Sequence, residues 1–505
     1  MSLISLFFLF LSWLTYISSL GVVVGTTGIL TSRYKPNELV RVLIQPGYSN
    51  QEWIHNRGVY SPTNLTNTLH QGQHSLLLLL FLQHLTHGSL SEWVAVEKKT
   101  PVGHEEPAKS IETEHPVVVP FALAGEEVIA RIARVFPTHT VAQIVSVEKA
   151  APERTEPKCK YYGSCTGCQL QHVKYSTQLE MKDEIIRKLF RFVKEGEEDG
   201  EDGRVFRAIV ASPQSYEYRT KITPHFQVQR KTRQMGAIGF NSLAGGNVDI
   251  EECPLATPAI NSTLKDLRKN ILDSKGTYSK GVSLILRESM DKLSEAVTVQ
   301  TNHKAPCYEI VQGIEFVFSA GQFFQVNRSI LSLVTSYVRE ELLRDGRVKN
   351  LLDCYCGSGL FLLTASSHFE AAFGVEVNAD SVKRLEEVVK KNELTNVRVF
   401  LGDSAEIFSQ LPNSVDPGRT GVVLDPSRDG CSTTFLDQLL DFAPRQVVYM
   451  ACDPATQARD VRYLLSSGKY RVTRVQPFDF FPQTHHIENA VTLQLVSPAG
   501  EPTIV

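Results

Sequence analysis

From about residue 330 onward, the chain alternates apolar runs of strand length with segments of helical period. The apolar runs are KNLLDCYCGSGLF (349–361), AAFGVEV (371–377), VRVFLGD (397–403), GVVLDP (421–426) and QVVYMAC (446–452). Between the second and third runs, ADSVKRLEEVVKKN (379–392) has its apolar residues on one helical face. Alternation of this kind is typical of parallel strands joined by crossover helices, so it predicts an open α/β sheet.

Each of these runs ends in a polar or reactive residue. The end residues are Asp353, Glu376, Asp403, Asp425 and Cys452. In open parallel sheets, ligands bind outside the carboxyl ends of the strands. We therefore expect these side chains to lie along one edge of the sheet and to form a site there.

A glycine turn follows the first strand. Gly357 and Gly359 lack Cβ atoms, so a backbone turn there can let a cofactor approach the next helix closely. Glu376 follows about 20 residues later, where an acid usually grips a ribose diol. Asp403 is placed to read an adenine edge. Because the third glycine of the dinucleotide fingerprint is absent, the pattern favours S-adenosylmethionine over NAD.

Cys452 ends the run 446–452, and Glu488 ends the stretch HHIE (485–488). They are of the residue types that methylation of uracil carbon-5 would use. Carbon-5 of uracil is a poor nucleophile, so its methylation needs a thiolate to add at carbon-6 and a base to remove the carbon-5 proton. Taken singly, a strand cysteine is more often a small core residue, and a Glu beside His is more often a surface residue. The HHIE stretch lacks the spacing of a zinc motif, so we do not expect zinc there.

The residues before the α/β region divide into two parts. Short alternating runs from about 91 to 157 predict a small OB-like β-barrel, a common oligonucleotide binder. Residues 158–320 mix a helical segment with short strands, which predicts an α+β domain. Between Arg204 and Met235, seven basic residues stand against one acid and are interleaved with aromatic ones. That pattern suits unstacked RNA, and it suits a solvated face of strands equally well.

The nine cysteines are distributed unevenly, with none in the first 158 residues. This favours a reducing compartment with metal-binding and catalytic thiols over a disulfide framework. Cys159, Cys165 and Cys168 fall within ten residues, which rarely arises from packing alone. Four thiolates would suit either zinc or an iron–sulfur cluster, and the spacing leaves both open.

Residues 1–32 contain no charged side chain and form an apolar stretch long enough to span a bilayer. A secretory signal normally begins with basic residues, whereas the first charge here is Arg33. Two interpretations stay open, a membrane anchor or targeting segment and a leader that is not native. Residues 1–90 are therefore unassigned, and a membrane is a partner only if this leader is real.

Several segments together resemble the RNA (uracil-5-)-methyltransferase family, which makes 5-methyluridine in tRNA and rRNA. The segments are, in order, LDCYCGSGLF, GVEVN, VVLDPSRDG, VYMACDPATQARD and FPQTHHIE. Upstream, FSAGQFFQVN (318–327) is similar to that family's entry to the catalytic domain, and CKYYGSCTGCQLQH (159–172) to its cluster-binding segment. Residues 91–157 resemble its TRAM domain, and the whole is most like the tRNA enzymes that carry one.

The resemblance implies a role for each matching residue. Cys452 would be the nucleophile, Glu488 the base, and Arg428 would lie near the target base. The pocket for S-adenosylmethionine and uracil would be lined by Gln325, Tyr355, Gly357, Gly359, Glu376, Asp403 and Asp425. A [4Fe–4S] cluster would be held by Cys159, Cys165, Cys168 and Cys253.

Two positions depart from the family's pattern. Ser427 stands where a second proline is usual, and Asp453 stands where Asn usually follows the nucleophile. An extra carboxylate beside Cys452 would raise its thiol pKa if the two side chains approach.

We predict an intracellular enzyme, cytoplasmic, nuclear or mitochondrial, with no protein partner implied. Its parts would be a leader (1–90), a TRAM-like barrel (91–157), a central domain with the cysteine cluster (158–320) and a Rossmann-like methyltransferase domain (321–505). It would methylate carbon-5 of the T-loop uridine of tRNA through a bond from Cys452 to carbon-6. The alternatives are an rRNA uridine, and an RNA-binding or RNA-folding protein with little turnover. Cytosine methylation uses the same thiol addition, but its usual motifs are absent.

Overall fold

The computed structural model describes the backbone of 39–44 and 92–98, and residues 117–136, 139–194, 204–229, 231–232, 234–274, 278–290, 296–403, 407–408, 411–412 and 414–496. The apolar stretch 1–32, the acidic stretch 195–202, Arg230 and Arg233 lie outside these ranges. Within the described ranges, no helix has the length and apolar character needed to cross a membrane.

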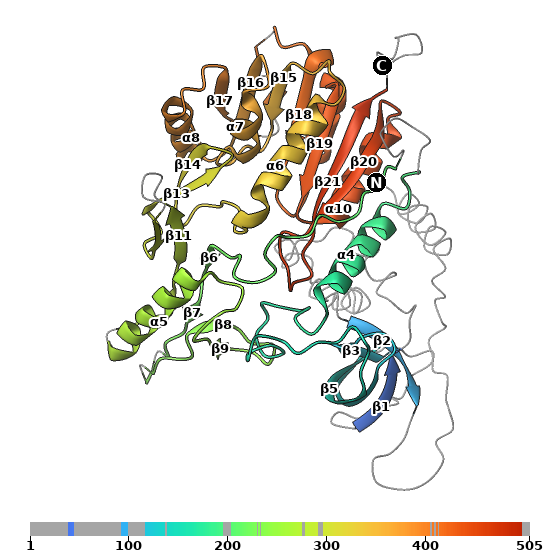
Figure 1. Cartoon of the computed structure of the whole chain (residues 1–505), viewed down its shortest axis with the longest axis vertical. Helices are drawn as coiled ribbons and strands as arrows, with labels where there is room; N and C mark the ends of the chain where they lie inside the picture. Colours follow the sequence, from blue (N-terminus) through green and yellow to red (C-terminus); the bar gives the residue numbers. More distant parts are fainter. Residues whose placement is uncertain are drawn as a thin grey trace, which may run out of the picture.

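The carboxyl-terminal part is built on one seven-stranded sheet with the order β17-β16-β15-β18-β19-β21-β20 (Figure 1). Its strands are β15 (Asn350–Asp353), β16 (Ala371–Glu376), β17 (Val397–Leu401), β18 (Thr420–Leu424), β19 (Gln446–Ala451), β20 (Tyr470–Phe478) and β21 (Glu488–Leu495). Strands β15 to β19 pair in parallel, whereas β21 runs antiparallel to both β19 and β20. The predicted α/β sheet is confirmed, and its central runs are apolar throughout because both faces are covered.

Helices cover the two faces of this sheet and produce two cores. One face packs against α6 (Arg328–Leu343), α7 (Leu360–Ser366), α8 (Ala379–Lys391) and the hairpin of β13 (Pro306–Val311) and β14 (Ile314–Ser319). The other face packs against α9 (Thr433–Phe442), α10 (Pro454–Ser466) and α4 (Tyr175–Leu189). Helix α4 comes from the central region, so that region is anchored directly onto the catalytic sheet.

A closed barrel with the order β1-β2-β3-β5-β4 precedes the central region. Its strands are β1 (Leu39–Ile44), β2 (Glu92–Lys98), β3 (Val117–Pro120), β4 (Glu127–Val135) and β5 (Thr140–Lys149). Strands β2 to β5 lie on the alternating runs of 91–157. Strand β1 comes from the stretch 1–90, which the sequence left unassigned. It pairs with β2 and β4, and such long-range pairing leaves no local signal in a six-residue run.

Besides α4, the described part of the central region has short strands and a second helix, α5, that packs on them. Its elements are β6 (Lys221–Ile222), β7 (His225–Phe226), β8 (Gly239–Asn241), β9 (Asn247–Asp249), α5 (Pro258–Asp273), β10 (Val282–Ser283), β11 (Leu286–Met290) and β12 (Val297–Gln300). The strands form two small sheets, ordered β10-β7-β8-β9 and β12-β11-β6. This mixture agrees with the predicted α+β character.

Candidate active site

The carboxyl ends of the parallel strands and the start of β21 meet at one edge of the large sheet. Asp353 is the last residue of β15 and Glu376 the last of β16. Asp425 directly follows β18, and Cys452 directly follows β19. The tertiary structure therefore brings these four side chains to the same edge, as their positions at strand ends predicted.

Cys452 and Glu488 lie on neighbouring strands. The antiparallel pairing of β19 with β21 ends at Ala451 and Asn489. Cys452 is the next residue along the chain after Ala451, and Glu488 is the residue just before Asn489. Glu488 is buried and Cys452 is half-buried. The charge of Glu488 acts on the Cys452 thiol, so the two groups lie close together at the end of this strand pair.

The surroundings of Cys452 keep its sulfur protonated in the unliganded protein. Burial, then the charges of Glu488 and Asp425, raises the pKa of the Cys452 thiol to about 12. The Arg428 guanidinium acts in the opposite direction. Arg428 is exposed in the turn after β18. Its charge lowers the pKa of both Cys452 and Glu488, so it lies near both groups. A thiolate at this position needs help from a bound ligand or a proton acceptor.

The carboxyl groups at this edge disfavour one another's ionisation. Burial, then the charge of Asp425, raises the pKa of Asp353 to about 8. Burial raises the pKa of Asp425 to about 7, and burial followed by Asp425 raises that of Glu488 well above its ordinary value. Among the described residues, Oδ1 of Asp353 has no hydrogen-bond partner although it is buried. A cationic ligand would favour the charged forms of all three groups.

The glycine turn is joined to the acid at the end of β16. Gly357 and Gly359 have φ values of 52° and 83°, a region that suits glycine. A Cβ added at Gly359 would lie 2.5 Å from Cδ1 of Leu385. The Gly357 N–H donates to Oε2 of Glu376 at 3.0 Å, and the Asn378 N–H donates to Oε1 at 2.8 Å. Two backbone donors therefore fix the Glu376 carboxylate beside the turn.

Gln325 lies in the segment between β14 and α6, which contacts the central region. The segment that carries it leads into α6, and the central strands donate to its carbonyls. Lys221 Nζ donates to the carbonyl of Gln322 at 3.4 Å, and the buried Arg287 guanidinium donates to the carbonyls of Phe324 and Gln325 at 3.3 and 3.4 Å. Gln325 itself is buried.

The remaining predicted residues lie less centrally. Tyr355 is half-buried, packs its ring edge-on to Phe435 and donates to Sγ of Cys431 at 3.9 Å. Asp403 is exposed just beyond β17. Both lie near strand ends, but neither is among the groups that shift the pKa of Cys452.

Asp453, which follows Cys452 where the family usually has Asn, is the N-cap of α10. Its Oδ1 accepts from the N–H groups of Ala455 at 3.0 Å and Thr456 at 3.3 Å. Asn caps a helix equally well, which explains why either residue fits here. The charge of Asp453 still raises the pKa of Cys452, but less than burial, Glu488 or Asp425 does. Ser427, the other departure, is exposed.

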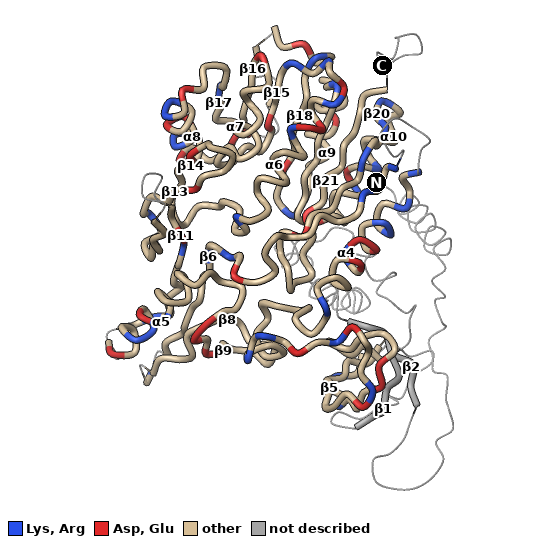
Figure 2. The backbone as a smooth tube through the Cα atoms, viewed as in Figure 1, with Lys and Arg blue, Asp and Glu red and all other residues tan. Residues whose placement is uncertain are grey.

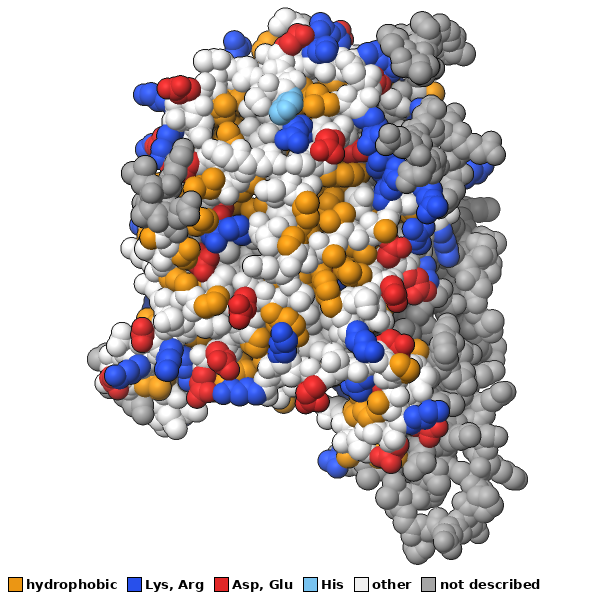
Figure 3. All heavy atoms as spheres, in the orientation of Figure 1, with side chains coloured by type: hydrophobic (Ala, Val, Ile, Leu, Met, Phe, Trp, Pro, Cys, Tyr) orange, Lys and Arg blue, Asp and Glu red, His pale blue; other side chains and the backbone are white. Residues whose placement is uncertain are grey.

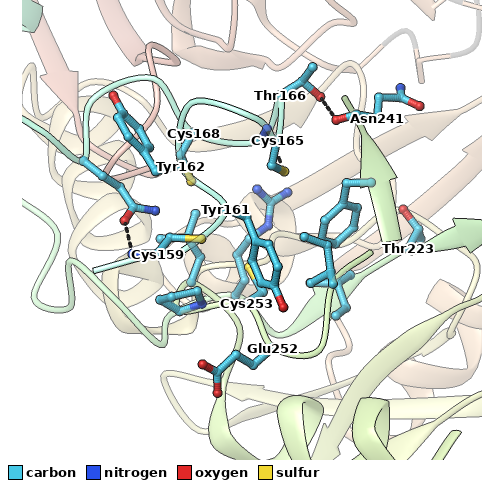
Figure 4. A pocket seen from close by; sticks show the side chains of 18 of the residues that line it. Cys159, Tyr161, Tyr162, Cys165, Thr166, Cys168, Thr223, Asn241, Glu252 and Cys253 are labelled. Atoms are coloured by element: carbon cyan, nitrogen blue, oxygen red, sulfur yellow. Dashed lines mark hydrogen bonds between the residues drawn. The ribbon is translucent and has the colours of Figure 1, made fainter. Parts of the chain in front are cut away.

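Four cysteines line one pocket of about 510 Å³ below the sheet edge (Figure 4). They are Cys159, Cys165, Cys168 and Cys253. Burial, then the side chains of Cys253, Cys159 and Cys165, raises the pKa of Cys168 to about 12, although a hydrogen bond from Gln171 opposes this. In the part of the chain that the structure describes, no three His, Cys, Asp or Glu side chains are grouped closely enough to hold one metal ion. The expected four residues share a pocket, but they are not arranged around a single ion.

The basic and aromatic stretch 204–235 does not form one RNA-stacking surface. The sequence left base stacking and a solvated face of strands equally open, but Phe206, Tyr218 and Phe226 are buried, so these three rings fit neither interpretation. Arg219 and Lys221 line the cysteine pocket instead. Figure 2 shows other basic positions along α4 and β20, and Figure 3 shows basic side chains on the same side of the molecule. The described basic residues on or next to these elements and α10 include Arg187, Arg191, Arg204, Arg207, Arg462 and Arg471.

Residues 479–487, which link β20 to β21, contain contacts that sequence reasoning missed. Lys182 of α4 and Asp479 form an ion pair at 2.6 Å with both side chains fully buried. Gln178 and Gln169 also bind this loop. No local pattern could have found these contacts, because the partners are about three hundred residues apart along the chain.

Comparison with known proteins identifies the same family as the sequence motifs did. A family profile described as tRNA (Uracil-5-)-methyltransferase matches residues 282–496. The chain is 38% identical over 399 residues to the tRNA (uracil(54)-C(5))-methyltransferase of Schizosaccharomyces pombe, covering 76% of this chain and 74% of the relative. The enzyme of the same name from Saccharomyces cerevisiae is 32% identical over 443 residues, covering 75% and 69%.

One solved structure shares the fold. It is the Pyrococcus abyssi tRNA (uracil-54, C5)-methyltransferase in complex with S-adenosyl-L-homocysteine. The TM-score is 0.57 at 22% sequence identity, and the match covers 75% of this chain and 95% of that one. A match over 75% of the chain is larger than the seven-stranded sheet with its helices, so the shared fold extends beyond that sheet.

Proposed function

Because this chain belongs to the tRNA (uracil-5-)-methyltransferase family, we propose that it methylates carbon-5 of a uridine in tRNA, using S-adenosylmethionine. The uridine would be the T-loop residue, which the names of the two yeast relatives number 54. The observation that carries the proposal is the closeness of Cys452 and Glu488 where β19 ends and β21 begins. A nucleophile beside a buried carboxyl group is what this chemistry requires.

The residues act in sequence on the pyrimidine ring. The sulfur of Cys452 bonds to carbon-6, which places negative charge on carbon-5 and on the carbonyl oxygen at carbon-4. After carbon-5 has taken the methyl group, Glu488 removes the carbon-5 proton. The electron pair of that C–H bond restores the double bond between carbon-5 and carbon-6, and the sulfur leaves as a thiolate. To reach Cys452, the uridine has to be turned out of its loop, with Arg428 near the base.

The raised pKa values fit these roles. Cys452 must lose a proton before it adds, and Asp425, with a pKa of about 7, is a proton acceptor whose charge also acts on the thiol. Glu488 has a pKa well above that of an ordinary carboxyl group, which makes it a stronger base once it is ionised. Arg428 favours the thiolate.

The sheet edge has the features that S-adenosylmethionine needs. Gly357 and Gly359 leave room for close approach, and the Glu376 carboxylate is held beside them. Asp353 offers a buried oxygen that lacks a partner among the described residues. When bound, S-adenosylmethionine supplies a methyl group on a sulfonium, a cation that these carboxyl groups favour. Gln325, Tyr355, Asp403 and Asp425 would complete the pocket.

The cysteine pocket is proposed to hold the [4Fe–4S] cluster that the family resemblance implies. Its ligands would be Cys159, Cys165, Cys168 and Cys253, which line one pocket of about 510 Å³. Cysteine thiolates are the ligands that such clusters use. Iron and acid-labile sulfide measured in anaerobically purified protein test it.

The barrel is proposed to act as a TRAM domain that contacts RNA, since small closed barrels commonly bind oligonucleotides. The basic side chains near α4 and β20 offer phosphate contacts on another side of the molecule. Cellular tRNA as substrate places the enzyme's work inside the cell.

Incubation of the purified chain with S-adenosylmethionine labelled in the methyl group and with tRNA tests the proposal. We expect label in 5-methyluridine at the T-loop position, and none with Cys452→Ala. Label in ribosomal RNA but not in tRNA would favour the rRNA alternative. Tight tRNA binding with no label would favour the RNA-binding alternative, which the raised pKa of Cys452 makes a real competitor.

A further inference from the structure

The loop 479–487 leads directly into Glu488, and residues from other parts of the chain form hydrogen bonds with it at several positions. The Asp479 N–H donates to the carbonyl of Val210 at 2.9 Å, and Asn327 Nδ2 donates to the carbonyl of Phe480 at 2.9 Å. The Tyr218 hydroxyl donates to the carbonyl of Pro482 at 3.1 Å. Because Glu488 follows directly, whatever shapes this loop also decides where the carboxyl group lies.

Gln483 is the conformational centre of the loop. Its φ is 68°, in the left-handed region that residues with a Cβ rarely adopt, and its side chain is 2% exposed. Such a conformation persists only where the surroundings determine it, and it is often found at functional sites. The next question is which residues impose it.

Two segments of the central region hold Gln483 in place. The N–H groups of Gln169 and Leu170 both donate to its carbonyl at 3.0 Å. On α4, Gln178 Nε2 donates to Oε1 of Gln483 at 3.0 Å, and the Gln483 N–H donates back to Oε1 of Gln178 at 3.1 Å. Helix α4 lies beside the sheet end that carries this loop (Figure 1).

The contacts continue toward Glu488. Oε1 of Gln169 accepts from the His485 N–H at 3.4 Å and pairs with its Nδ1 at 3.1 Å. The Tyr162 hydroxyl donates to the carbonyl of Gln169 at 2.6 Å, which fixes Gln169 in turn. Gln169 directly follows Cys168, which lines the cysteine pocket. The segment that lines this pocket therefore forms hydrogen bonds with the loop both at Gln483 and at His485.

We propose that Gln483 is a positioning residue for proton abstraction: its left-handed backbone, held by Gln169, Leu170 and Gln178, sets the reach of Glu488 to the carbon-5 proton. The cysteine-bearing segment 159–171 thereby acts on the catalytic step through hydrogen bonds to the loop. This inference rests on the proposed function, since it needs Glu488 to be the base.

The chemistry provides a readout that a loss of stability would not produce. Once Cys452 has bonded to carbon-6 and carbon-5 carries the methyl group, the protein leaves the RNA only after the carbon-5 proton has been removed. If Glu488 is present but misplaced, the methylated RNA stays covalently attached to Cys452. Such a complex migrates as a protein–RNA band on a denaturing gel.

Gln483→Gly keeps the left-handed backbone accessible but removes the hydrogen bond that its Oε1 accepts from Gln178 of α4. Gln169→Ala removes the side-chain hydrogen bonds to His485 from a half-buried position. For both variants we expect kcat to fall by roughly tenfold, KM for tRNA and for S-adenosylmethionine to change less than about twofold, and the covalent methylated complex to accumulate. Gln312→Gly is the matched control. Gln312 also has a positive φ, 49°, but it lies exposed in the turn between β13 and β14.

Several results would overturn the inference. Unchanged kcat in both variants would do so, as would slower turnover without the covalent band, because that result indicates a general loss of folded protein. An equal effect of Gln312→Gly would show that the variants report stability alone. Glu488→Gln separates this from a failure of the proposed function. If Glu488→Gln accumulates the complex and Gln483→Gly does not, only the positioning role fails, whereas absence of the complex in Glu488→Gln contradicts the underlying chemistry.

Discussion

Cys452 at the sheet edge and Cys168 in the cysteine pocket look alike when their acidity is considered alone. Burial is the largest cause in both, and both thiols have a pKa raised to about 12. Their neighbours differ. Cys452 is next to Glu488, Asp425 and Arg428, whereas Cys168 is near three other thiols. The comparison teaches that the chemical role of a buried thiol is decided by what surrounds it, and that its protonation state alone does not reveal that role.

Removal of the sulfur at each site should break the resemblance most clearly. We expect Cys452→Ala to lower kcat by more than about 10⁴, because a covalent step has no substitute when its nucleophile is absent. Methylation of tRNA with labelled S-adenosylmethionine measures it. Cys307→Ala, which removes a buried thiol from β13, is the control and should retain methylation. Comparable activity in Cys452→Ala would exclude Cys452 as the nucleophile.

Titration should distinguish the carboxyl-lined edge next. As pH rises past about 7 and about 8, Asp425 and Asp353 ionise. We expect the affinity for S-adenosylmethionine to rise roughly tenfold between about pH 6 and about pH 9, since a sulfonium is attracted by carboxylates. Calorimetric titration measures it, with S-adenosylhomocysteine, which lacks the positive charge, as the control ligand. Equal pH dependence for both ligands would argue against this electrostatic role.

The same raised pKa values have a consequence for stability. Between pH 3.8 and about pH 8, folded Asp353 holds a proton that the unfolded chain has released. The free energy of unfolding therefore falls as pH rises through this range. The melting temperature of the unliganded protein should therefore decrease toward alkaline pH, and Asp353→Asn should reduce this slope. An unchanged slope would indicate that other groups govern it.

In the cysteine pocket we expect a smaller effect on catalysis. Cys253→Ser should remove most of the bound iron and lower the melting temperature, because loss of one ligand weakens both binding and folding. The transfer moves no electrons, so kcat should stay within about tenfold of the parent. Iron content, thermal melting and methylation are measured on the same preparation. A fall in kcat as large as that of Cys452→Ala would show that the two thiol sites are not separable.

The smallest effect is expected at Asp453. Asp453→Asn keeps the N-cap of α10, so the melting temperature should change little. The charge of Asp453 is a lesser cause of the raised pKa of Cys452, so kcat should change by less than about twofold. A tenfold gain in kcat would show instead that this carboxylate controls the thiol.

Much of the sheet edge could be predicted from the sequence. Asp353, Glu376, Asp425 and Cys452 end apolar runs, and parallel strands place their carboxyl ends together. Glu488 was assigned through a family resemblance, and in the folded chain its charge acts on Cys452 at the end of the β19–β21 pair. Its role, like that of the four pocket cysteines, stays a prediction until the variants are measured.

Other features left no trace that could be read locally. The aromatic residues of 204–226 suited either base stacking or a solvated face of strands, yet three of them are core residues, because the folded chain packs them against distant segments. Strand β1 belongs to the barrel through pairing with distant strands. Gln178 and Gln483 exchange hydrogen bonds across 305 residues, and no periodicity encodes such a contact.

The sequence by itself determined the alternation of strands and helices, the glycine turn and the identity of the reactive residues at the strand ends, since period and residue type are local properties. Only the tertiary structure decided which of these groups share an environment. The proximity of Cys452 to Glu488 and Asp425, the raised pKa values of the buried acids and the grip of the central region on the loop at Gln483 depend on burial and on contacts between distant segments. Those exist only once the chain has packed.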